Sequence, residues 1–133
     1  MSEAVFTSET QALLERAVDE ANGFWHSYLG TEHILLGLLS EPGDPIAIFK
    51  ECDVTLDDAR DQVMEVIGRG TFAPVDETIP MTPRARNLLA LALRKAHVDH
   101  RTQATPGDLA YAIVRTGGVA AIVLKKLAST RPA

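Results

Sequence analysis

The chain has few of the residues that would direct it to an oxidising compartment, a nucleic acid or a membrane. Its 133 residues include one cysteine, Cys52, which has no second thiol with which to form an internal disulfide. Lys and Arg total 13 against 18 Asp and Glu, and the net charge of −5 gives no electrostatic reason to bind nucleic acid or an anionic membrane. No apolar stretch approaches the roughly 20 residues that span a bilayer, and no secretory signal opens the chain. We therefore expect a cytoplasmic protein without nucleic-acid or membrane partners.

Alternating β-branched runs are also absent, and the apolar residues recur instead at helical spacing. A chain of this length supports one domain that buries about two-thirds of its unfolded surface. Helix starts are marked by residues whose side-chain oxygen can cap a free backbone N–H group, at Thr7, Thr31, Asp44, Thr55, Thr82 and Thr105. The segment "GGVAAIVLKKLAS" adds a seventh helix. We predict an all-α fold of about seven helices.

Two parts of the chain repeat the same apolar pattern. "FTSETQALLERAVDEA" and "MTPRARNLLALALRKA" match at a separation of 75 residues, and His26 to Thr31 matches His100 to Thr105 at a separation of 74. The pattern predicts a duplicated four-helix unit whose second copy is cut short after its third helix. We expect one compact domain over residues 1–133, with repeat one at about 4–70, a proline-containing linker at 71–80, repeat two at about 81–128 and a tail at 129–133.

The segment "GTEHILLGLL", followed some forty residues later by "IPMTPRARNLLALALRKA", resembles the Clp N-terminal (Clp-N) domain, most closely its ClpC branch. The likeness covers about residues 4–128. It implies a doubled helical module that sits above an ATP-driven ring and binds adaptors, substrates or arginine-phosphorylated tags. The chain itself has no G-x-x-x-x-G-K-[ST] phosphate loop. Its tail "STRPA" lacks the eighth helix that the ClpC module carries, so we expect a freestanding relative.

The start of "GTEHILLGLL" combines two kinds of binding group. If Thr31 caps the helix, free backbone N–H groups and the positive end of the helix dipole gather beside Glu32. The resemblance implies that Thr31 and Glu32 bind phosphoarginine, with His33 and, in the second copy, Thr105 as further candidates. The same residues also fit a purely structural role, because Thr caps helices and an early Glu favours the dipole by about 0.3–1 kcal/mol.

The second copy departs from the family pattern at this place. Where the family repeats Gly-Thr-Glu-His, the chain has Ala104, Thr105, Pro106 and Gly107. The cap and a proline suited to the first helical position are kept, but the carboxylate is lost. Asp108 most simply completes a capping box with Thr105. We therefore expect the second phosphoarginine site to be weak or absent.

A second candidate surface surrounds the helix start after the linker. In the ClpC branch this surface binds protein partners and cyclic peptide antibiotics, and the resemblance carries that role onto Met81, Thr82, Pro83, Arg84 and Arg86. Met81 stands where the family usually has phenylalanine, and Glu3 lies near the position of another, so two aromatic anchors worth about 1–3 kcal/mol each are lost. The structural alternative is that Thr82 and Pro83 only start a helix.

Catalytic chemistry has little support in the sequence. No Ser-His-Asp or Cys-His motif is present, and Cys52 fits a small buried apolar residue. His97 and His100 invite a metal hypothesis, but they lack a third ligand and we expect them in a solvated loop. We predict no enzyme, metal or cofactor. The expected function is a module that binds substrates, adaptors or phosphoarginine tags and modulates a ClpC–ClpP degradation system; the alternative is a decoy that sequesters ClpC-directed cyclic peptide antibiotics.

Overall fold

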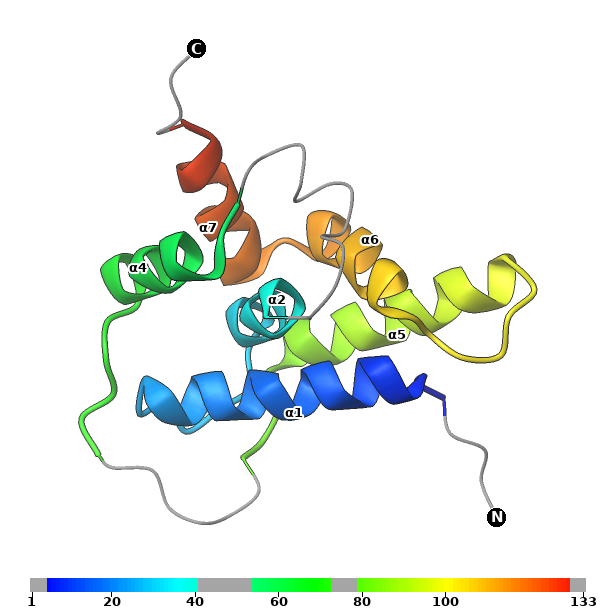
Figure 1. The fold of residues 1–133 in the computed structure, drawn as a ribbon, viewed down its shortest axis with the longest axis horizontal. Helices are drawn as coiled ribbons and strands as arrows, with labels where there is room; N and C mark the ends of the chain where they lie inside the picture. Colours follow the sequence, from blue (N-terminus) through cyan, green and yellow to red (C-terminus); the bar gives the residue numbers. More distant parts are fainter. Residues whose placement is uncertain (1–4, 41–53, 73–78, 130–133) are drawn as a thin grey trace.

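The computed structural model describes residues 5–40, 54–72 and 79–129. These residues form helices α1 (Ser8–Gly23), α2 (Thr31–Leu39), α4 (Leu56–Val66), α5 (Pro83–Val98), α6 (Pro106–Thr116) and α7 (Gly118–Ser129) (Figure 1). The described ranges contain isolated β-bridges but no β-strand. The all-α prediction is confirmed. The helix expected after Asp44 lies outside the described residues.

Helix α2 is the centre of the core, and it packs against α1, α4, α5, α6 and α7. Figure 1 shows the other helices arranged around it. Residues 31–38 of α2 are all buried. A helix that is apolar on every side belongs in an interior, and this explains the sequence "ILLGLL" better than a one-sided amphipathic pattern does.

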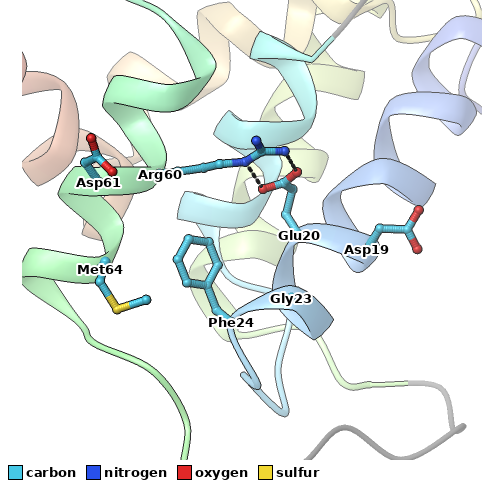
Figure 2. Close-up of a pocket in the computed structure, with 7 residues that line it drawn as sticks. All are labelled: Asp19, Glu20, Gly23, Phe24, Arg60, Asp61 and Met64. Carbon is cyan, nitrogen blue, oxygen red and sulfur yellow. Dashed lines mark hydrogen bonds and ion pairs between the residues drawn. The ribbon is translucent and has the colours of Figure 1, made fainter.

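An ion pair fastens α4 to α1 on one side of the core. The Arg60 guanidinium donates from Nε to Glu20 Oε1 at 2.9 Å and from Nη2 to Oε2 at 2.6 Å (Figure 2). Two parallel bonds fix the guanidinium in the plane of the carboxylate. The pair therefore sets the orientation of α4 against the last turns of α1.

Two symmetric backbone contacts join the repeats. The N–H of Leu29 donates to the Pro80 carbonyl at 2.8 Å, and the N–H of Thr82 donates to the Leu29 carbonyl at 2.9 Å. In the same way, the Ala104 N–H donates to the Val5 carbonyl at 2.9 Å, and the Thr7 N–H donates to the Ala104 carbonyl at 3.2 Å. The second helix of each repeat therefore begins beside the first helix of the other repeat.

The described backbone places the helix starts of the two repeats in a register of 75 residues. Trp25 and His100, which are 75 positions apart, both have a left-handed φ of 62°. The bridge positions before α2 and α6 differ by the same number. His26 therefore corresponds to Arg101, and the predicted separation of 74 in this segment is wrong. The sequence comparison aligned His26 with His100 and Thr31 with Thr105. The backbone instead aligns the two left-handed turn residues and the two helix starts.

Two consecutive glycines make the turn from α6 to α7. Gly117 and Gly118 have φ of 77° and 79°, a left-handed conformation that glycine adopts without steric cost.

Among the described residues no single helix is long and apolar enough to cross a membrane; α6 and α7 together meet that test of length and composition only as a pair bent by 87°.

Candidate functional site

The N-cap of α2 is Gly30, with φ −106° and ψ 177°, and the prediction that Thr31 caps this helix is wrong. Glycine has no side chain to cap with, so His33 reaches back and its Nδ1 accepts the Gly30 N–H at 2.9 Å. A Cβ atom at Gly30 would lie 2.3 Å from Glu32 Oε1. A larger residue at this position would therefore require the Glu32 carboxylate to move from its place over the helix start.

Thr31 instead supplies a cap to a different helix. Its Oγ1 accepts the backbone N–H of Ala120, in the first turn of α7, at 3.2 Å. Thr31 is 2% exposed, and a Cβ at Gly118 would lie 3.0 Å from the same oxygen. The hydroxyl thus satisfies a free N–H group of α7 and holds α7 against the start of α2.

Glu32 is also only 2% exposed, and its carboxylate has a partner within the chain. The Tyr28 hydroxyl donates to Glu32 Oε2 at 3.1 Å. Burial, the charge of Glu32 and this hydrogen bond together raise the pKa of Tyr28 to about 12. The sequence predicted that the Glu32 carboxylate is open to a guanidinium. In the structure one of its oxygens already accepts the Tyr28 hydroxyl.

A pocket of about 730 Å³ opens above these residues. It is lined by Tyr28, Thr31, Glu32, Thr82, Pro83, Arg84, Gly118, Val119, Ala121 and Ile122. The lining brings together the N-termini of α2, α5 and α7, each of which carries a partial positive charge and free N–H groups. Residues that the sequence assigned to two separate surfaces, around Glu32 and around Arg84, therefore line one pocket.

The pocket carries charges of both signs. The Arg84 side chain is exposed and its Nη1 donates to the Thr116 carbonyl at 3.1 Å, which leaves its other nitrogens for a ligand. Glu32 contributes the negative charge. A ligand with an anionic group for Arg84 and the helix N-termini, and a cationic group for Glu32, matches this arrangement.

His33 is fully buried, and both of its ring nitrogens are engaged. Because Nδ1 accepts the Gly30 N–H, Nε2 carries the proton and donates to His26 Nδ1 at 2.8 Å. His26 Nε2 in turn donates to the Gly68 carbonyl at 2.8 Å. This chain of bonds requires both imidazoles to be neutral. Burial, and then the neighbouring His26, lower the pKa of His33 to about 3. His33 therefore has no ring nitrogen left for a ligand in this structure, and it acts instead at the start of α2.

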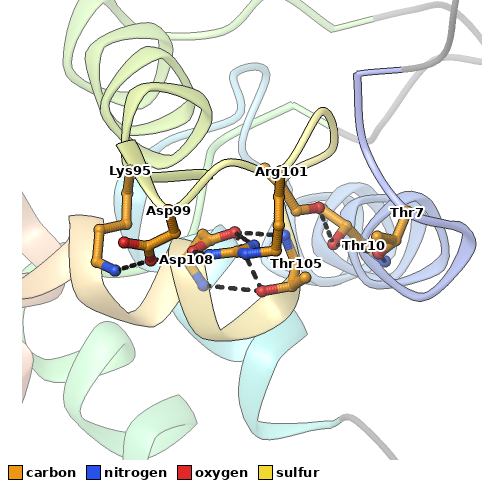
Figure 3. Close-up of polar contacts among 8 residues, drawn as sticks. Thr7, Thr10, Lys95, Asp99, Arg101, Thr105 and Asp108 are labelled. Atoms are coloured by element: carbon orange, nitrogen blue, oxygen red, sulfur yellow. Dashed lines mark hydrogen bonds and ion pairs between the residues drawn. The ribbon is translucent and has the colours of Figure 1, made fainter. Parts of the chain in front are cut away.

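In the second repeat an ion pair replaces the histidine pair (Figure 3). Thr105 Oγ1 accepts the Asp108 N–H at 3.3 Å and Asp108 Oδ2 accepts the Thr105 N–H at 2.8 Å, which confirms the predicted capping box. Arg101 donates to both oxygens of Asp108, at 2.6 and 2.8 Å. Burial alone would raise the pKa of Asp108, but the hydrogen bonds from Arg101 and Thr105 hold it below its ordinary value. Thr105 corresponds to Gly30 and is not among the residues that line the pocket, and its hydroxyl caps the start of α6.

Met81 and Arg86 line a different, more apolar pocket of about 500 Å³ on the side of α1. Its other lining residues are Gln11, Leu14, Glu15, Val18, Leu29 and Ile79. The predicted partner surface is therefore divided between two pockets. The division arises because Met81 precedes α5 and packs beside Leu29 through the backbone bridge, whereas Thr82 to Arg84 form the start of the helix.

The remaining candidates are His97, His100, Cys52 and Glu3. His97 and His100 are both exposed, and α5 continues through His97, so only His100 lies in the predicted loop. Within the described ranges, no three His, Cys, Asp or Glu side chains come close enough to share a metal ion. Cys52 and Glu3 lie outside the described residues.

Comparison with known proteins assigns the chain to a family. The profile of the Clp repeat (R) N-terminal domain matches residues 5–127, nearly the whole chain. The chain belongs to the Clp-N family. Its fold agrees, since this Clp-N domain superposes on the N-terminal domain of the chaperone ClpD from Arabidopsis thaliana with a TM-score of 0.76 at 19% identity, covering 92% of this chain and 83% of that one. The Hsp104 N-terminal domain from Candida albicans gives 0.65 at 17% identity, covering 96% and 91%.

Curated relatives are much longer than this Clp-N domain. It is 40% identical over 126 residues to an ATP-dependent Clp protease ATP-binding subunit ClpA homolog from Porphyra purpurea, covering 92% of this chain and 15% of the relative. It is 38% identical over 125 residues to the chloroplastic chaperone protein ClpC1 of Oryza sativa subsp. japonica, covering 92% and 13%. The chain therefore spans about one-seventh of the relatives' length, and its similarity is to the domain only.

Proposed function

We propose that this Clp-N domain is a non-catalytic module that binds arginine-phosphorylated tags or segments of substrates and adaptors for a ClpC–ClpP degradation system. The observation that carries the proposal is the pocket in which Glu32 and Arg84 meet beside the N-termini of α2, α5 and α7. The family supports a role in Clp proteolysis, because the relatives are named as subunits of Clp proteases. The charges that line the pocket support the choice of ligand.

A phosphoarginine side chain presents both charges that the pocket can receive. The phosphoryl oxygens would accept N–H groups at the helix starts and from Arg84, while the guanidinium nitrogens would donate to Glu32. The guanidinium must displace the Tyr28 hydroxyl from Glu32 Oε2. The Tyr28 hydroxyl is neutral and makes one bond to the carboxylate, whereas a guanidinium is charged and can make two, so this exchange favours the ligand.

The first prediction concerns Glu32. Replacing it with Gln keeps an acceptor for the Tyr28 hydroxyl but removes the charge, and free phosphoarginine should then bind at least tenfold more weakly, since a charged hydrogen bond is worth about 1.5–3 kcal/mol. Isothermal titration calorimetry measures the affinity. Glu9→Gln, which removes an exposed carboxylate from the start of α1, is the matched control and should bind like the wild type. No heat with the wild type, or equal affinities for both variants, would end the proposal.

A second prediction is one phosphoarginine per chain. In the register of 75, Gly107 occupies the position of Glu32 and Glu9 occupies the position of Arg84. The equivalent place beside the starts of α6 and α1 thus lacks the carboxylate for a guanidinium, and Glu9 puts a carboxylate where a phosphoryl group would need a cation. The calorimetric stoichiometry reports this directly, and a value of two would contradict it.

The alternative function, a decoy for ClpC-directed cyclic peptide antibiotics, is favoured by the apolar pocket at Met81. Leu14, Val18, Leu29 and Ile79 line it with Met81, a set suited to an apolar peptide face. Titration with such an antibiotic should give binding that Met81→Glu weakens and that saturating phosphoarginine does not compete away. Absence of binding to the wild type would remove this alternative.

A further inference from the structure

A groove of about 510 Å³ separates the end of α1 from α4 (Figure 2). It is lined by Asp19, Glu20, Gly23, Phe24, Arg60, Asp61 and Met64. None of these residues lines the pocket at the start of α2 or the pocket at Met81. The groove is therefore a separate feature that the proposed function does not use.

The floor of the groove is apolar. In Figure 2 the Phe24 ring and the Met64 thioether lie between the two helices. Phe24 is 8% exposed and Met64 is 42% exposed. Met64 therefore lies away from the side of α4 that is buried in the core. A flexible, polarisable methionine at an open surface adapts its shape to apolar side chains of a partner.

Three large apolar residues close in sequence to this floor are also exposed. Trp25 follows Phe24 and is 36% exposed, and Ile67 lies three residues beyond Met64 and is 40% exposed. Phe72 is 84% exposed, the highest fraction among the large apolar residues described. Concentrated exposed apolar surface is typical of protein interaction sites.

The cations of this region are already engaged. Both hydrogen-bonding edges of the Glu20 carboxylate are taken by Arg60, so this pair presents no net charge to a ligand. The Arg69 guanidinium lies over the Trp25 ring, 4.7 Å from its centroid. Neither arginine forms an ion pair with Asp19 or Asp61.

The acids Asp19 and Asp61 flank the apolar floor from α1 and α4. Both are exposed, and among the described residues no side chain forms an ion pair or hydrogen bond with either carboxylate. Neither α1 nor α4 has a basic residue in its last turn, where the helix dipole is negative. The groove thus combines an apolar floor with two exposed carboxylates that have no ion-pair partner among the described residues.

We propose that this groove binds a segment of a partner protein in which a large aliphatic side chain is flanked by arginine or lysine. The aliphatic group would cover Phe24 and Met64, and the cation would pair with Asp19 and Asp61. A second copy of the chain is a poor occupant, because two molecules of net charge −5 repel each other at an acidic groove. The chemistry of the groove therefore specifies a basic, amphipathic segment.

The test uses a fluorescein-labelled, capped eight-residue peptide of alternating leucine and arginine. Fluorescence anisotropy should show binding that weakens with added salt, and amide resonances of residues around Gly23 and Asp61 should shift on titration. The double variant Asp19→Lys and Asp61→Lys should bind at least tenfold more weakly. The matched control, Glu9→Lys with Asn87→Lys and Ala90→Lys, makes the same change in net charge at exposed sites of α1 and α5 outside the groove and should bind nearly as well as the wild type.

Several results would overturn the proposal. These are no binding to the wild type, equal loss in the control variant, tight binding of a peptide with glutamate in place of arginine, or amide shifts confined to another face. A wild-type dimer in sedimentation that Asp61→Lys dissociates would make the groove a self-association surface instead. Glu32→Gln should leave the peptide affinity unchanged, so this proposal and the phosphoarginine proposal fail independently.

Discussion

Lowering the pH from 6.5 towards 3 is expected to destabilise the fold by on the order of 4 kcal/mol through His33 alone. In the unfolded chain this imidazole has its ordinary pKa of 6.5, whereas burial and His26 lower it to about 3 in the fold. Between these values the unfolded state binds more protons, so the free energy of unfolding rises with pH. The contribution is complete above pH 6.5 and is lost as the pH falls through this range.

The measurement is urea denaturation at a series of pH values, with His33→Gln for comparison. The glutamine oxygen can still accept the Gly30 N–H, as Gln does at the third position of a capping box, but it does not titrate. Between about pH 5 and 6.5, where most carboxylates remain ionised, the wild type should lose roughly 1 kcal/mol per pH unit and the variant much less. Parallel curves for the two proteins would refute the buried neutral histidine.

The second repeat offers an internal contrast to this titration. Arg101 and Asp108 occupy the positions of His26 and His33, and their pairing lowers the pKa of Asp108 and raises that of Arg101. Neither group changes charge between pH 5 and 6.5. Acid in that range should therefore loosen the start of α2 before the start of α6, and hydrogen exchange of the two helix starts would resolve the order.

The helices were predictable from the sequence because their signals are local. Thr7, Thr55, Thr82 and Thr105 each accept the N–H three residues on, as their position before an apolar-periodic segment predicts. Thr31 is the exception, because a long-range bond to Ala120 uses its hydroxyl. A preference for capping cannot reveal that another helix competes for the same oxygen.

The candidate site was only partly predictable, because local signals identify single residues but not which of them come together in the fold. The sequence identified Glu32 and Arg84, but it gave no sign that the backbone bonds of Leu29 place them in one pocket. The Tyr28 hydroxyl was missed because Tyr28 precedes α2, so no helical spacing relates it to Glu32. The contribution of α7 depends on the turn at Gly117, whose direction no local pattern specifies.

Replacing Gly37 with Ala is expected to destabilise the fold by about 1–3 kcal/mol, even though Ala favours a helix by up to about 1 kcal/mol. A Cβ at Gly37 would lie 2.5 Å from the Leu13 carbonyl oxygen and 3.2 Å from the Ala17 Cβ, both in α1. The first of these is a backbone atom, so α1 and α2 must move apart at the centre of the core. The equivalent position of the second repeat is Ala112, which shows that a Cβ fits where the helices are spaced for it.

Gly23→Ala is the matched control for this substitution. A Cβ at Gly23 meets no atom within 4 Å, so helix propensity acts there alone and the variant should be as stable as the wild type or slightly more stable. Urea midpoints of the two variants should therefore shift in opposite directions or differ by at least 1 kcal/mol in unfolding free energy, by the estimates above. Equal midpoints would mean that α1 and α2 are not in the close contact on which the burial of His33 and Glu32 depends.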